Sequence, residues 1–114
     1  MSVEGFYTLK VHNPANGWVG EGVVILETQR LYGGDSAYGW IGSYTASGGT
    51  ITATAKIVQF ASLLPTAVNM FGTSLTNYEV EMSGDIKSMT GFISAKIPNT
   101  PRLNIKLVKQ ADLP

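Results

Sequence analysis

The chain has 114 residues, of which 44% are apolar and 10% aromatic, so it is expected to fold as one globular domain over residues 1–114. Lysine plus arginine equals aspartate plus glutamate at 8 each, and no cluster of cations stands out, which argues against direct nucleic-acid binding. The absence of cysteine excludes disulfides, thiolate nucleophiles and cysteine-based metal sites.

Targeting signals are not evident. Residues 1–5 lack the basic and apolar regions of a signal peptide, and no apolar run approaches the roughly 20 residues that a membrane-spanning helix needs. We expect a cytoplasmic protein that does not enter a membrane.

The first 60 residues predict five strands. Apolar and polar residues alternate over 5–11, and the turn-forming residues 12–17 precede an extended run over 18–27 whose inner face is expected to hold Trp18, Gly20, Gly22 and Val24. A short strand at 30–32, a strand over 38–44 and a regular alternation over 50–60 follow. Breaks are expected at 33–36 and 46–49.

Between residues 61 and 75 the alternation fails, which predicts an irregular segment or one short helix. Three further strands are expected around 78–82, 93–97 and 103–107, with turns at Gly84-Asp85 and at 98–101. About eight strands with short connections and no internal repeat favour an all-β, antiparallel up-and-down barrel, whose closure removes exposed strand edges.

Residue types that carry catalysis are scarce. His12 is the only histidine, and beside a turn it is expected to be a solvated or capping side chain. The carboxylates are expected in turns or on the surface, namely Asp35, Asp85, Asp112 and the pair Glu79 and Glu81, which share one strand face. We therefore expect no enzyme, no metal site and no cofactor.

Two features have a structural and a functional interpretation. Gly33-Gly34-Asp35 could cradle a phosphate, but extended residues follow it where a phosphate loop needs a helix. A tight corner in which Asp35 accepts backbone hydrogen bonds is the expected case. The barrel interior is either filled by aromatic side chains, which is the expected case, or left open for one small apolar ligand. Its candidate residues are Tyr7, Trp18, Tyr38, Trp40 and Tyr44.

A family resemblance rests on Gly5-Phe6-Tyr7, Gly20-Glu21-Gly22 and Gly33-Gly34-Asp35 with Tyr38 and Gly42. Together these motifs, within about residues 5–58, resemble the GrlR-like family, bacterial negative regulators of type III secretion. The resemblance implies a lipocalin-like barrel, often a homodimer, that binds and sequesters a transcriptional activator.

One departure from the family concerns the turn that follows the strand over 38–44. In the characterised regulator of the family, this turn carries an acidic run that is implicated in holding the activator. The matching residues of this chain are Ala46, Ser47, Gly48 and Gly49. Regulation of secretion therefore does not carry over with the fold.

Two hypotheses follow. In the first, the protein is a non-enzymatic interaction module and homodimer that binds a protein partner through an apolar patch, with candidate residues Leu63, Leu64, Val68, Met70 and Phe71. In the second, it is a calycin-like carrier with a small apolar ligand in the barrel. A filled interior argues against the carrier, and a continuous apolar cavity favours it.

Overall fold

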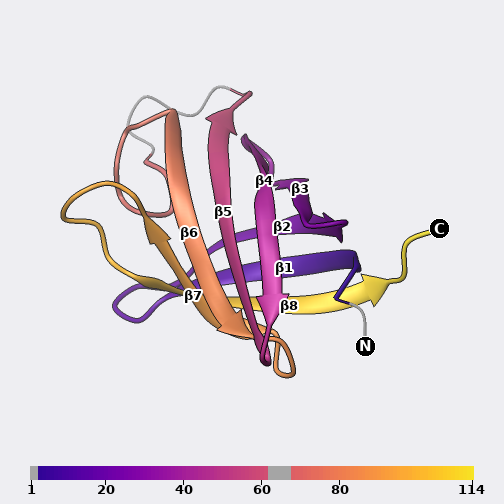
Figure 1. Ribbon diagram of the computed structural model, residues 1–114. Coiled ribbons are helices and arrows are strands. Elements are labelled where there is room, and N and C mark those ends of the chain that lie inside the picture. The colour runs from indigo at the N-terminus through magenta and orange to yellow at the C-terminus, as the bar shows by residue number, and fades with distance from the viewer. Residues whose placement is uncertain (1–2, 62–67) are drawn as a thin grey trace.

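A computed structural model describes residues 3–61 and 68–114 as a closed antiparallel barrel (Figure 1). Its eight strands follow one another around the barrel in chain order: β1 (Gly5–Asn13), β2 (Gly17–Glu27), β3 (Arg30–Gly34), β4 (Tyr38–Ser47), β5 (Thr50–Gln59), β6 (Asn77–Asp85), β7 (Thr90–Ala95) and β8 (Leu103–Ala111). β1 pairs with β8 and closes the barrel. The predicted all-β up-and-down barrel is confirmed.

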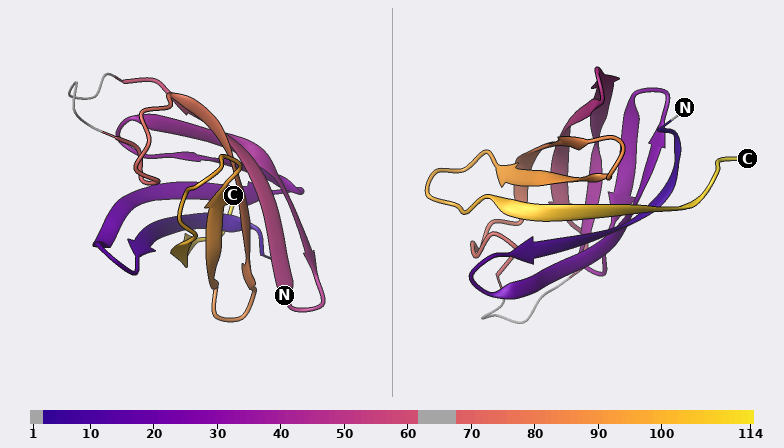
Figure 2. Two further views of the ribbon diagram at one scale, coloured as in Figure 1. Left: turned by 90° about the vertical axis from the view of Figure 1, so that its left-hand side faces the viewer. Right: turned by 90° about the horizontal axis from the view of Figure 1, so that it is seen from below.

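The two ends of the barrel differ in their connections. One end, here called the hairpin end, carries the β2–β3, β4–β5 and β6–β7 turns and both chain termini, since Phe6 pairs with Ala111. The other, the loop end, carries the β1–β2 and β3–β4 turns and the longer β5–β6 and β7–β8 connections. Figures 1 and 2 show the strands strongly twisted, with β1, β2 and β8 running crosswise to β4, β5 and β6.

Alternation of side chains builds the core. In β5, Ile51, Ala53, Ala55 and Ile57 are buried, while the intervening threonines and Lys56 are exposed, as predicted. The small Ala53 lies in the ladder between Tyr44 of β4 and Met82 of β6, so a small residue is flanked by bulky ones. The other strands contribute buried residues to the same cluster.

Several predicted boundaries were wrong by a few residues at glycines. Gly33 and Gly34 belong to β3, and the break falls at 35–37; Gly84 and Asp85 end β6, and the turn is at 86–89. β7 covers Thr90–Ala95 rather than 93–97. Glycines usually mark turns, but these pair across strands at positions where the strands approach closely, so composition misplaced the turns.

Trp18 is the main correction to the predicted interior, because 62% of its surface is exposed. Val11 pairs with Gly20 while His12 pairs with Trp18, so Val19 is an extra residue in β2 and forms a β-bulge. The bulge reverses the alternation, and Trp18 therefore points outward. Its ring meets the edge of His12 with centroids 5.2 Å apart.

The described part of the β5–β6 connection packs against the loop end of the barrel. Residues 60–61 and 68–76, the described part of this connection, contain no helix. The buried Asn69 organises it: its amide nitrogen donates to Thr73 Oγ1 at 2.7 Å, and its Oδ1 accepts from the backbone nitrogen of Phe71 at 2.9 Å. Phe71 is thereby held against Tyr78, with ring centroids 5.9 Å apart.

This arrangement corrects the predicted partner surface. Phe71 is only 4% exposed and belongs to the core, because the Asn69 turn directs it into the barrel. Met70 is half-buried and Val68 is exposed. Leu63 and Leu64 lie outside the described residues.

Candidate functional site

The glycine–glycine–aspartate corner between β3 and β4 is structural. Asp35 Oδ1 accepts hydrogen bonds from the backbone nitrogens of Ala37 at 2.9 Å and Tyr38 at 2.8 Å, as expected for a turn aspartate. A Cβ at Gly33 would collide with the carbonyl oxygen of Val23, and one at Gly42 with that of Thr54. The two glycines therefore allow close approach of the neighbouring strands.

Four of the five aromatic residues predicted for the interior do lie there. Tyr7, Tyr38, Trp40 and Tyr44 are buried, and Trp18 is not. The Tyr7 hydroxyl donates to the carbonyl oxygen of Val3 at 2.6 Å, and burial raises the pKa of the Tyr7 phenol. Burial also raises the pKa of the Tyr38 phenol, with the Asp35 carboxylate adding to the effect.

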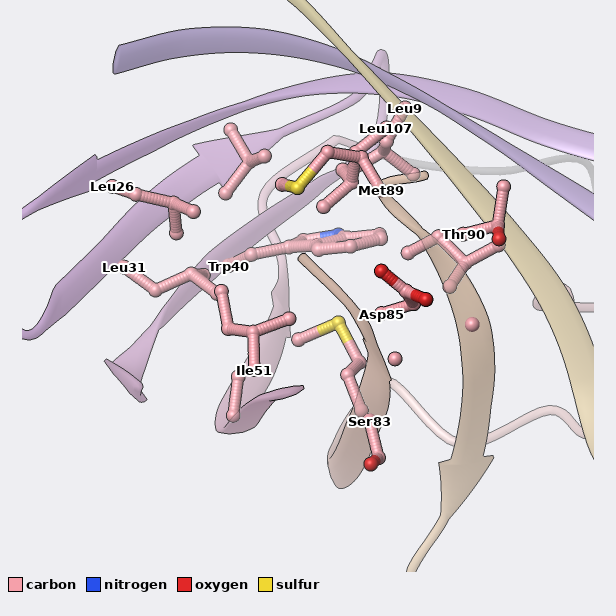
Figure 3. Close-up of a pocket in the computed structure, with 16 residues that line it drawn as sticks. Leu9, Leu26, Leu31, Trp40, Ile51, Ser83, Asp85, Met89, Thr90 and Leu107 are labelled. Atoms are coloured by element: carbon pink, nitrogen blue, oxygen red, sulfur yellow. The ribbon is translucent and has the colours of Figure 1, made fainter. Parts of the chain in front are cut away.

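An apolar cavity of about 40 Å³ remains inside the barrel, toward the hairpin end (Figure 3). Inward-facing residues of most strands and the β6–β7 turn line it, including Leu26, Leu31, Trp40, Ile51, Met82 and Met89. For scale, a cavity of roughly 150 Å³ holds benzene. As described, the cavity therefore has room for a few heavy atoms, not for the larger ligand of a carrier.

The indole of Trp40 crosses the middle of this lining (Figure 3). Trp40 is 3% exposed, and its Nε1 has no hydrogen-bond partner among the described residues. The hydroxyls of Ser83 and Thr90 point away from the indole (Figure 3). The Asp85 carboxylate at the rim accepts hydrogen bonds from the backbone nitrogens of Lys87 at 2.6 Å and Ser88 at 3.2 Å.

A second candidate site is the outside of β2 to β5. Ile25 pairs with Tyr32, and Tyr32 pairs with Ile41, so these three side chains form one row across β2, β3 and β4. In the next row, Val23 and Val58 flank two paired glycines. Together with Phe60 they form what we call the outer wall: Val23, Ile25, Tyr32, Ile41, Val58 and Phe60, all at least one-third exposed.

Several charged residues form ion pairs on the surface. Glu79 and Glu81 share the outer face, as predicted, and Lys96 Nζ lies 3.5 Å from Glu79 Oε2 and 3.4 Å from Glu81 Oε1. Asp112 pairs with Lys109 at 2.7 Å, and this hydrogen bond lowers the pKa of the Asp112 carboxyl. Across residues 3–61 and 68–114, no three potential metal ligands come together.

Sequence reasoning missed two features of these sites. The outer wall combines residues from four consecutive strands, and only the register between these strands brings its side chains together. The alternation in the sequence predicted which residues face inward, but it did not single out apolar residues on the outer face. The unpaired Trp40 Nε1 has no sequence signal, because the lack of a partner depends on every neighbour in the folded barrel.

The sequence matches no protein-family model and no curated protein. The resemblance to the GrlR-like family therefore stays a prediction. Within the part of the chain that the structure describes, no helix has the length and apolar character needed to cross a membrane.

Proposed function

We propose that this chain is a non-enzymatic protein-binding module of the cytoplasm, and that its outer wall docks against a second copy of the chain. The outer wall is the observation that carries the proposal. Ile41 at its centre is 54% exposed and Phe60 at its edge 65% exposed, although a side chain of either type is stabilised by leaving water.

The size of the outer wall suits the core of a dimer interface. Six large side chains with these exposed fractions present on the order of 500 Å² of apolar surface, near the upper end for a monomer. A stable interface buries roughly 800 Å² on each partner, with an apolar centre and a polar rim. The outer wall would supply the centre, and its surrounding residues the rim.

The charges around the outer wall are compatible with pairing of identical surfaces. Glu27 and Arg30 are cross-strand partners beside the Ile25–Tyr32 pair, and Lys56 pairs with Ile41. In a two-fold interface the same surface of both copies meets. A rim that carries both positive and negative side chains can therefore pair opposite charges across the interface and avoid net repulsion. The formal net charge of zero likewise leaves association unopposed.

The resemblance to GrlR-like regulators suggests what the dimer would do, which is to bind and sequester a transcriptional regulator. The turn between β4 and β5, at Gly48 and Gly49, carries no carboxylate. Recognition of such a partner would therefore depend on apolar contacts or on other charged groups, and not on an acidic run in this turn.

The first test is the oligomeric state of Ile41→Glu, measured by sedimentation velocity at high micromolar concentration. We expect a dimer for the native chain and a monomer for the variant, because two buried carboxylates would face each other's apolar surface. Val108→Glu is the matched control: Val108 is also exposed on a strand, β8, but lies outside the outer wall.

Three outcomes would contradict the proposal: a monomeric native chain, a dimer that survives in Ile41→Glu, or a dimer lost equally in Val108→Glu. Circular dichroism of both variants establishes that the barrel remains folded. If Ile41→Glu remains a dimer while Val108→Glu becomes a monomer, a face other than the outer wall joins the two copies.

A further inference from the structure

The interior cavity has two properties that a simple packing defect lacks. The first is the unpaired Nε1 of Trp40, a buried donor in an apolar lining. A buried donor without a partner costs about 1–3 kcal/mol of stability, so native structures rarely keep one without a purpose. Since Trp40 lines the cavity, an acceptor atom that reached Nε1 from the cavity would restore that free energy.

The second property is the backbone of Met89 in the β6–β7 turn. Met89 has φ of 52°, a left-handed conformation that a long side chain rarely adopts. Two hydrogen bonds hold it there: its nitrogen donates to the Asp85 carbonyl at 2.8 Å, and its carbonyl accepts from the Leu107 nitrogen at 2.8 Å. In Figure 3 the Met89 side chain lies over the cavity across from Ile51.

Met89 therefore closes the cavity with a side chain that adapts easily. Methionine has three rotatable bonds and a polarisable sulfur, and it fills or vacates irregular space at low cost. Met82 lines the same cavity. Because both methionine side chains are flexible, the 40 Å³ cavity can adapt to an occupant somewhat larger than itself.

We propose that this cavity binds a small, neutral, largely apolar molecule through one acceptor oxygen, such as a ketone or aldehyde carbonyl, that receives the Trp40 Nε1 hydrogen. The apolar lining selects the hydrocarbon part. The Asp85 carboxylate at the rim disfavours anions, and no lysine or arginine lines the cavity to pair with one. This inference does not depend on the outer wall, which lies on the opposite face of the strands.

Water is the competing occupant. A buried water normally makes two to four hydrogen bonds. Beside the Trp40 donor the lining is largely apolar, and the Ser83 and Thr90 hydroxyls point away from the indole, so the cavity is a poor site for water. A carbonyl group needs only that one donor, and its substituents match the lining. The chemistry of the lining thus favours the organic occupant.

The test is titration with 2-butanone and 2-pentanone, followed by the indole N–H resonances in ¹H–¹⁵N correlation spectra. The chain has two tryptophans, and Trp18→Phe assigns the remaining indole signal to Trp40. We expect a saturable downfield shift of the Trp40 indole proton in the native chain and in Trp18→Phe. The isosteric alkenes 2-methyl-1-butene and 2-methyl-1-pentene, which lack an acceptor oxygen, should not produce this downfield shift.

Two variants separate the hydrogen bond from the cavity. Trp40→Phe keeps an aromatic lining but removes the donor, so the preference for ketone over alkene should fall about fivefold, measured through the methyl resonances of Met82 and Met89. Ala53→Val fills part of the cavity and leaves Nε1 in place, so both ligands should lose binding. This second variant keeps the test decisive if Trp40→Phe does not fold.

The proposal is overturned if ketones leave the Trp40 signal unchanged up to their solubility limit, or if ketone and alkene act alike. It is also overturned if the Trp40 indole proton shows a persistent contact to a long-lived water that ketones fail to displace. A shift confined to Trp18 would place binding on the exterior instead.

Discussion

Burial has opposite effects on the ring and on the hydroxyl of Tyr78. Its ring packs edge-on against Phe71 and Tyr38 at the loop end, and its hydroxyl has no hydrogen-bond partner among the described residues. Burial raises the pKa of this phenol well above its ordinary value of 10.0, and the neighbouring Tyr38 and Asp35 add to the shift. Burial of the ring therefore stabilises the barrel, whereas burial of the unpaired hydroxyl destabilises it.

Replacing Tyr78 by Phe should therefore stabilise the barrel by about 1 kcal/mol at neutral pH, because the ring stays and the unpaired hydroxyl goes. Urea denaturation measures the change. The half-exposed Tyr32 supplies a control, since Tyr32→Phe should change the free energy of unfolding by less than about 0.5 kcal/mol. A destabilised Tyr78→Phe variant would mean that the hydroxyl has a partner, such as an ordered water.

The same residue predicts the alkaline stability. In the unfolded chain Tyr78 loses its proton near pH 10, whereas in the barrel its raised pKa retains the proton to higher pH. Below pH 10 the phenol is protonated in both states and the free energy of unfolding does not depend on its ionisation. Above pH 10 only the unfolded chain loses the proton, so the free energy of unfolding should fall as the pH rises. Tyr78→Phe should show a shallower fall. Equal slopes in the two proteins would argue against a buried, neutral Tyr78.

At the scale of the strands, glycines determine how closely neighbours approach. A Cβ at Gly42 of β4 would lie 2.7 Å from the Cα of Ala55 in β5, and that backbone cannot rotate away. At Gly39 of the same strand, a Cβ would meet only atoms 4.0 Å away, an ordinary contact. Glycine is thus required at one position and incidental at the other.

The expected result is that Gly42→Ala destabilises the barrel by roughly 3 kcal/mol or more, through overpacking against the neighbouring backbone. Gly39→Ala should be neutral within about 0.5 kcal/mol. Both are measured by urea denaturation at low micromolar concentration, where association does not contribute. If the two substitutions cost the same, the close approach of β4 and β5 at Gly42 is not rigid.

At the scale of the whole molecule, association should be governed by apolar contact. The chain has no net charge, and the outer wall is apolar, so screening has little long-range charge interaction to remove. We predict that the dissociation constant of the dimer changes less than about threefold between roughly 0.05 and 0.5 M NaCl at pH 7. Sedimentation velocity over a dilution series at each salt concentration measures it. A steep weakening with salt would show that ion pairs at the rim, not the outer wall, join the copies.

The sequence by itself determined the fold class, the strands and most of the interior. The reason is local, because a strand with one buried face must alternate apolar and polar residues with period two. The inward-facing residues of β5 can therefore be predicted without knowing which strands they pair with: Ile51, Ala53, Ala55 and Ile57. The Asp35 corner was equally local, since its hydrogen bonds reach only two and three residues along the chain.

Only the tertiary structure decided the features that depend on how strands and loops meet one another. The bulge at Val19 turned Trp18 outward, the Asn69 turn drew Phe71 into the core, and the register of four strands assembled the outer wall. The unpaired Trp40 Nε1 is also a property of the whole barrel. An alternating pattern specifies which residues face the same way, but register and chain reversal specify which of them meet, and these arise only when the strands have closed on one another.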